Sequence, residues 1–207
     1  LDVGCGGGHL TYRLTRLVSE VVACDLTESM LAAVVEQASL RGLPNIDTRE
    51  AAAESLPFQT ATFDVVATRF SAHHWHAFAE GIAEMARVLK PGGLALMSDV
   101  VSPGVSLLDT WLQTLELLRD PSHVRDASTE EWDAALAAAG LAIERIEYFR
   151  LRLDFATWVA RMNTPEPQVI AIRVLQARAA SAVKDYFEME EDGSFTVDTA
   201  LFVARKT

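Results

Sequence analysis

A glycine-rich segment, Gly4-Cys5-Gly6-Gly7-Gly8, lies close to the start of the chain. It follows an apolar strand end and precedes a segment, 9–19, that has the length of one short helix. Glycines let the backbone turn sharply there and let a ligand approach it without a Cβ in the way. The N-terminus of the following helix supplies free N–H groups and the positive end of its dipole. This turn predicts an α/β fold that binds a ligand at the carboxyl edge of its first strand.

Strand-like and helix-like segments alternate after this turn. Apolar runs predict strands over 21–25, 63–70 and 94–101, and more weakly over 46–50. Helices are expected after Thr27, a candidate N-cap, and over 78–89. Because the connections are short, this alternation favours a mostly parallel sheet with helices on both faces.

The second half of the chain has a different pattern. Helices are expected over 106–119, over a segment that ends at Gly140 and begins with a capping box of Ser128 and Glu131, and over 168–187. Alternating apolar and polar residues predict strands over 149–155 and 195–205. A length of 207 residues suits one domain covering 1–207. Because the chain opens with Leu1 at the end of a strand, we expect that an N-terminal segment is missing from it.

The charge of the chain bears on its partners. The net charge of −11 and the pI near 4.9 give a surface that repels phosphate backbones, so nucleic acid is not expected as a partner. No apolar run approaches the ~20 residues of a membrane span, and no leader is recognisable. We therefore expect a cytoplasmic protein without integral membrane association. Cys5 and Cys24 do not make a disulfide framework.

A second feature indicates what the glycine turn binds. Asp25 ends the next strand, where a carboxylate can accept hydrogen bonds from two ribose hydroxyls. This combination occurs in proteins that bind nicotinamide dinucleotides and in those that bind S-adenosylmethionine. The dinucleotide fingerprint would need glycine at position 9, where this chain has His9. The spacing of Gly4, Gly6 and Gly8 therefore favours the sulfur nucleoside.

Several segments together resemble a known family, the class I S-adenosylmethionine-dependent methyltransferases. They are LDVGCGGGHL, VVACDLTESML, AESLPFQTATFDVV and LKPGG, in this order. More narrowly, they are similar to the ubiquinone and menaquinone biosynthesis C-methyltransferases, while RFSAHHWH, RDPSHVR and WVARMNTP resemble a subgroup of uncharacterised methyltransferases. The resemblance implies a Rossmann-like three-layer sandwich with a seven-stranded, mostly parallel sheet whose last strand is antiparallel. It also implies a cofactor-binding half, 1–102, and an acceptor-side half, 103–207.

The resemblance also assigns residues to the cofactor. It implies that Asp25 binds the ribose and that other residues border the methionine part, the adenosine side or the adenine. These others are Asp2, Gly4, Cys5, Gly6, Gly8 and Arg69 for the methionine part, Leu26 and Met30 for the adenosine side, and Ala53 and Glu54 for the adenine. Two departures stand out. Ala52 replaces an acid that many relatives direct at the adenine amino group, and the segment that we expect to be missing before Leu1 would hold the family's N-terminal helical lid.

Histidines are the candidate catalytic residues. His73 and His74 follow the fourth strand on the edge where the methyl group should lie, and one of them could orient or deprotonate an acceptor. They could instead cap a turn or pack against Trp75. No metal site is expected, because adjacent histidines without a matching acid cluster do not have the ligand spacing of zinc.

Four further residues are predicted to roof the acceptor pocket: His123, Arg125, Arg161 and Asn163. The resemblance carries this assignment, and surface contacts or salt bridges are an equally good interpretation. Among the tryptophans, Trp111 and Trp158 are the better candidates for lining the pocket.

The predicted function is methyl transfer from S-adenosylmethionine to a small-molecule acceptor, with release of S-adenosylhomocysteine. A protein of the same fold that binds the cofactor without turnover, in a regulatory role, remains the alternative. The acceptor, the atom that is methylated and the oligomeric state are left open by the sequence.

Overall fold

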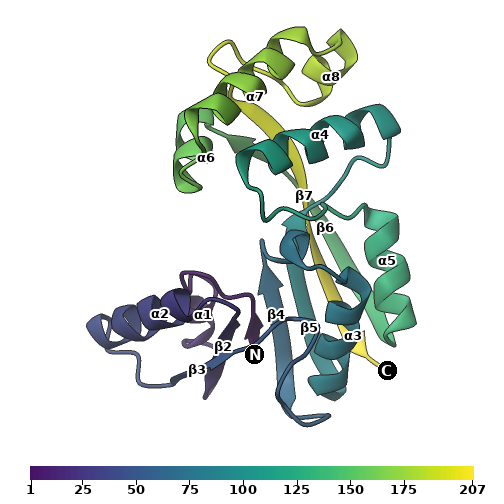
Figure 1. The fold of residues 1–207 in the computed structure, drawn as a ribbon. Coiled ribbons are helices and arrows are strands. Elements are labelled where there is room, and N and C mark those ends of the chain that lie inside the picture. The colour runs from purple at the N-terminus through teal and green to yellow at the C-terminus, as the bar shows by residue number, and fades with distance from the viewer.

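The computed structural model describes all 207 residues, and its seven strands form one sheet in the order β3-β2-β1-β4-β5-β7-β6 (Figure 1). The strands are β1 (Asp2–Val3), β2 (Val21–Asp25), β3 (Ile46–Glu50), β4 (Phe63–Arg69), β5 (Leu89–Val100), β6 (Leu141–Leu153) and β7 (Phe195–Lys206). The helices are α1 (Thr11–Leu14), α2 (Glu28–Leu40), the 3-10 turn η1 (Ala72–His74), α3 (Phe78–Val88), α4 (Ser106–Arg119), α5 (Thr129–Ala138), α6 (Phe155–Arg161), α7 (Glu166–Arg178) and α8 (Ser181–Tyr186).

The sheet has the predicted mixture of directions. Strands β1 to β5 pair in parallel, and β7 runs antiparallel to both of its neighbours, β5 and β6. The last strand is thus inserted between two others instead of extending an edge. The prediction of a mostly parallel seven-stranded sheet with an antiparallel last strand is confirmed.

Alternation along β2 shows how the helices cover the two faces. Val21 and Ala23 belong to clusters with residues of α1 and α2, whereas Cys24 belongs to the large core beneath α3 and α5. Since successive side chains of a strand point to opposite faces, α1 and α2 cover one face of the sheet and α3 and α5 the other. The result is the three-layer arrangement that the sequence predicted.

A second core lies beyond the carboxyl ends of the parallel strands. Helices α4, α6, α7 and α8 gather there (Figure 1) and bury Leu112, Trp158 and Phe187. Strand β7 joins the two cores, because Phe202 packs in the first and Phe195 in the second. This helical layer covers the edge at which the glycine turn and the histidines lie.

Some predicted elements differ in length from the observed ones. The helix expected over 9–19 is only the single turn α1, because the side-chain amide of Asn45 donates to the carbonyls of Thr15, Val18 and Ser19 and holds the chain in non-helical turns. The helix expected over 168–187 is two helices, because the backbone at Ala179 and Ala180 is extended. Strand β6 begins well before the predicted 149–155.

The capping box predicted at Ser128 is present. The Ser128 hydroxyl accepts from the backbone N–H of Glu131, and the Glu131 carboxylate accepts from the N–H of Ser128. Thr27 precedes α2 as expected, but its side chain makes no capping bond. No helix of the protein combines the length and the apolar character that crossing a membrane would require.

Candidate functional site

The glycine turn occupies the carboxyl end of β1, as predicted. Gly4, Gly6 and Gly8 have φ values of +67°, +48° and +78°, in the left-handed region that favours glycine. A Cβ at Gly4 would lie 1.8 Å from Ser71 Oγ, so a side chain has no room there. Beneath the turn, the Thr11 hydroxyl donates to the buried carboxylate of Asp2 at 2.6 Å. The turn is therefore held by contacts around Gly4 and Asp2, while open space adjoins Gly6 and Gly7.

A substitution at Gly4 is expected to destabilise the protein strongly. Gly4→Ala combines a left-handed φ with a clash against Ser71, and we expect the free energy of unfolding to fall by more than about 2 kcal/mol. That corresponds to a melting temperature about 4–8 °C lower for a chain of this size. Gly7→Ala is the matched control, because Gly7 has no positive φ and open space around it. Equal melting temperatures for the two variants would contradict the assignment.

Asp25 is anchored beside the turn by two backbone N–H groups. Gly6 donates to Oδ2 at 2.8 Å and Thr27 donates to Oδ1 at 2.9 Å. A carboxylate offers about four lone-pair positions, so one on each oxygen remains for a ligand hydroxyl. Directly beside it, Leu26 is 65% exposed and Met30 is 44% exposed. A carboxylate with spare acceptors next to open apolar side chains suits the ribose and the adenine of a nucleoside.

The segment predicted to border the adenine has a structural role as well. Ala53 is buried in the main core, and Glu54 Oε1 accepts from the backbone N–H of Ala77 at 3.2 Å. Glu54 thus ties this segment to the start of α3. Its other oxygen makes no hydrogen bond within the chain, so a role toward a ligand stays a prediction.

An open cleft of about 790 Å³ lies between the chain just after the glycine turn and the helical layer. His9, which directly follows the turn, and Arg69 line one side, and residues of β6 and α6 form the other side. A deeper pocket of about 220 Å³ shares five lining residues with the cleft: Phe70, Leu151, Leu153, Trp158 and Arg161. Phe70 has a φ of +51°, which is uncommon for a bulky residue. The shared wall is mostly apolar, as a site for an organic molecule should be.

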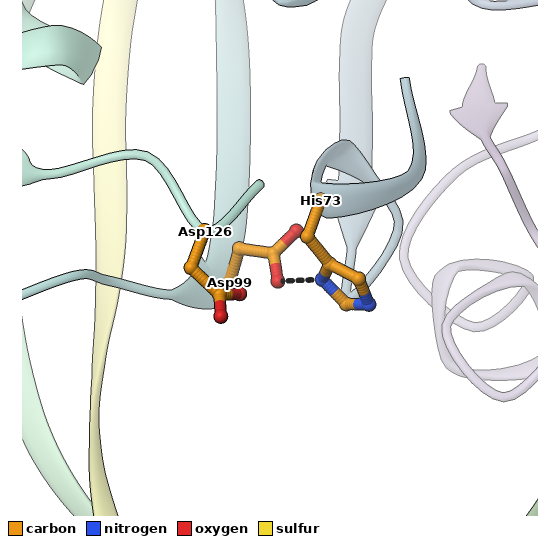
Figure 2. A group of neighbouring side chains, drawn as sticks. All are labelled: His73, Asp99 and Asp126. Carbon is orange, nitrogen blue, oxygen red and sulfur yellow. Dashed lines mark hydrogen bonds and ion pairs between the residues drawn. The ribbon is translucent and has the colours of Figure 1, made fainter. Parts of the chain in front are cut away.

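His73 lines the deeper pocket and is paired with Asp99. The distance from His73 Nδ1 to Asp99 Oδ1 is 2.6 Å, and Asp99 is 2% exposed. Figure 2 shows Nε2 of the imidazole pointing away from the acids. Burial by itself would lower the pKa of His73, but the charge and hydrogen bond of Asp99 outweigh it and raise the pKa to about 9. The ring is therefore an imidazolium near neutral pH.

Asp99 is saturated with donors. Besides His73, the backbone N–H groups of Ser71, Ala72 and Val100 donate to it. Although burial opposes ionisation, the charge of His73 and these hydrogen bonds hold the pKa of Asp99 below its ordinary value. The donors come from the start of the β4–α3 connection and from the end of β5, so folding fixes the orientation of the dyad.

A second buried acid lies beside this pair. Asp126 is placed so that potential ligand atoms of His73, Asp99 and Asp126 all lie within 4.8 Å of one another (Figure 2). The fold thus supplies the acids that the sequence did not place near the histidines. Because four donors already occupy Asp99, a cation would have to displace existing hydrogen bonds, so we interpret the cluster as one that holds protons. The absence of a bound metal stays a prediction.

Asp126 should make the stability of the protein depend on pH. Burial, and then the charge of Glu116, raises the pKa of Asp126 well above 3.8, and its Oδ2 has no hydrogen-bond partner. A raised pKa means that the folded state holds the proton more tightly, so stability falls as the pH rises above the ordinary value. Asp126→Asn removes this loss. The free energy of unfolding, measured with urea at pH 5 and pH 8, should fall less between these two pH values in the variant than in the wild type. An equal fall in both proteins would contradict the assignment to Asp126.

The other predicted acceptor residues lie in different places. His74 Nδ1 is 3.1 Å from the Ser122 carbonyl oxygen, and the ring lines the deeper pocket beside His73. His123 is buried against Gln113, where burial, followed by the charge of His73, lowers its pKa to about 4. Arg125 pairs with Asp109 and Glu131. Neither His123 nor Arg125 lines the cleft or the deeper pocket. Asn163 lies past the end of α6 and lines neither of them.

Of the predicted acceptor residues, Arg161 lines both the cleft and the deeper pocket. Trp158 does so too, while Trp111 packs against Phe187 in the second core. Sequence reasoning missed the role of Asp99. The available signal was Asp99 itself, an acid near the end of β5, the strand that pairs with β4, which His73 follows.

Comparisons with known proteins agree with this arrangement. A family model described as a methyltransferase domain matches residues 1–97. The chain is 45% identical over 203 residues to YafE of Escherichia coli, covering 98% of both chains. It is 34% identical over 187 residues to YcgJ of Bacillus subtilis, an uncharacterized methyltransferase, covering 90% of this chain and 74% of the relative.

A solved structure and a more distant relative extend the comparison. The crystal structure of YcgJ superposes with a TM-score of 0.94 at 32% identity, covering 99% of this chain and 90% of that one. The ubiquinone/menaquinone biosynthesis C-methyltransferase of Pseudomonas paraeruginosa is 38% identical over 112 residues, covering 52% of this chain and 44% of the relative. Fold, glycine turn and relatives agree that the chain belongs to the class I S-adenosylmethionine-dependent methyltransferases.

Proposed function

We propose that the protein transfers a methyl group from S-adenosylmethionine to a small organic acceptor bound between the cleft and the deeper pocket that His73 lines. The observation that carries the proposal is an imidazole, held in place by Asp99, in a pocket that shares a wall with the cleft beside the glycine turn. The sulfonium supplies the electrophilic methyl group, and S-adenosylhomocysteine is released. The chain's own contribution is to bind, align and exclude water.

Four features support the cofactor site. The left-handed φ values of Gly4, Gly6 and Gly8 shape the turn, and the open space at Gly6 is available for the methionine part, beside the buried Asp2 and Cys5. Asp25 keeps acceptors for the ribose hydroxyls. Exposed apolar surface at Leu26 and Met30 is available for the adenosine side, and Ala53 and Glu54 lie in the loop that follows β3. Arg69 lines the same cleft as His9, which directly follows the glycine turn.

His73 is proposed as the residue that orients the acceptor, with Asp99 as its positioning residue. As an imidazolium it donates a hydrogen bond through Nε2, which suits an acceptor oxygen that carries or develops negative charge. Its deprotonated form, populated at higher pH, is the only form that could act as a base. His74 has a pKa lowered by burial and by the charge of His73, and it lies between Ser122 and Asp120 on the outer side. His73 is therefore the better candidate.

The first experiment is calorimetric titration with S-adenosylmethionine, S-adenosylhomocysteine and NAD in parallel. Saturable binding of both sulfur nucleosides without binding of NAD supports the cofactor assignment. An acceptor screen that measures S-adenosylhomocysteine release then tests turnover. Binding without turnover across a broad panel would favour a regulatory protein, and failure to bind either sulfur nucleoside would overturn the proposal.

A further inference from the structure

The cleft differs from the rest of the protein in its charge. The chain has 29 acidic and 18 basic residues, yet the charged side chains lining the cleft are four arginines and one aspartate. The single acid, Asp154, is engaged as the N-cap of α6, where its carboxylate accepts from Thr157 N–H. An excess of arginine in a concave site of an acidic protein raises the local concentration of anions.

Two of these arginines already have partners. Arg150 pairs with Asp198 and Glu188, and Arg152 pairs with Glu190. The other two, Arg69 and Arg161, are exposed and make no side-chain hydrogen bond or ion pair within the chain; Arg69 only stacks over the ring of Phe70 at 4.5 Å. Their guanidinium groups keep all of their donors for a ligand.

The deeper pocket has the opposite character. It contains the acids Glu116, Asp120 and Asp126; of its two arginines, Arg119 is paired with Glu116, and Arg161 lies on the wall that the pocket shares with the cleft. An anionic group therefore belongs at the shared wall, where Arg161 lies, and not among the acids of the pocket. The apolar wall shared by both, which includes Phe70, Leu151 and Trp158, offers a surface for an apolar molecular body.

We propose that the acceptor is an organic acid whose ionised group is bound by Arg161. Its apolar body packs against the wall formed by Phe70 and Trp158. The planar guanidinium of arginine matches a carboxylate or phosphate and can bind it through two parallel hydrogen bonds. This inference rests on the proposed function, because it specifies the acceptor class of the same site.

The test compares an acid with its neutral counterpart, 2-naphthoate against 2-naphthamide, in the presence of saturating S-adenosylhomocysteine. Binding is followed by tryptophan fluorescence, since Trp158 lines the cleft. We expect the acid to bind about tenfold more tightly than the amide, and the preference to weaken as salt is added. Arg161→Gln should remove most of the preference, and Arg161→Lys should keep part of it.

Arg178→Gln is the matched control, because Arg178 is an exposed, unpaired arginine on α7 outside the cleft. It should keep the wild-type preference. Equal binding of acid and amide, no binding of the acid, or an acid preference that survives Arg161→Gln overturns the inference. Titration with S-adenosylhomocysteine alone separates the two proposals, since loss of cofactor binding counts against the methyltransferase function and not against the acid preference.

Discussion

Replacing Asp25 with alanine is expected to weaken the binding of S-adenosylmethionine by about 100-fold or more. Two hydrogen bonds from ribose hydroxyls to a carboxylate contribute about 1.5–3 kcal/mol each, and about 1.4 kcal/mol corresponds to a tenfold change in Kd. The substitution also leaves the N–H groups of Gly6 and Thr27 without the carboxylate to which they donate hydrogen bonds. Both effects act on the same site, so the dissociation constant from calorimetry is the measurement.

The controls separate ligand binding from loop structure. Glu36→Ala removes an exposed acid on α2 and should leave the dissociation constant unchanged. Asp25→Asn keeps an oxygen acceptor for the loop but loses the charge and one acceptor, so it should bind more weakly than wild type and better than Asp25→Ala. Melting curves establish that each variant is folded. Wild-type affinity in a folded Asp25→Ala protein would rule out the ribose assignment.

Replacing His73 with glutamine is expected to lower kcat by about 10²–10⁴-fold, the range typical of a positioned proton-bearing side chain. Asp99→Asn should lower it in the same direction, because His73 then loses the charge that keeps it protonated. The dependence of kcat on pH is the sharper test. With a pKa of about 9, the donor form is complete below the ordinary pKa of 6.5 and is lost as the pH rises through about 9.

In Asp99→Asn this loss should move to lower pH, because burial alone lowers the pKa of His73. A residue with a merely structural role would not shift the profile. His76→Gln is the control, since His76 is exposed and makes no side-chain hydrogen bond or ion pair, and its activity should match wild type. If the rate instead increased through pH 9, His73 would act as a base and the donor role would be wrong.

The cofactor half could be read from the sequence because its signals are local. The left-handed φ values at Gly4, Gly6 and Gly8 and the acid at the end of β2 depend on neighbours within a short stretch of chain. The seven-stranded sheet and its antiparallel last strand were predicted from resemblance to a family, not from periodicity, and the strand order came from the structure. Helix lengths were less predictable, since a distant side chain, Asn45, ends α1.

The sequence by itself determined the fold class, the glycine turn and the position of Asp25, because backbone geometry and hydrophobic pattern depend on residues that are close together in the sequence. Only the tertiary structure decided the acceptor side. It paired His73 with Asp99 across two strands, buried Asp126 beside them, and placed His123 and Arg125 away from the cleft. Long-range packing decides which charged side chains meet and which stay free, as Arg69 and Arg161 do, and no spacing along the chain encodes that outcome.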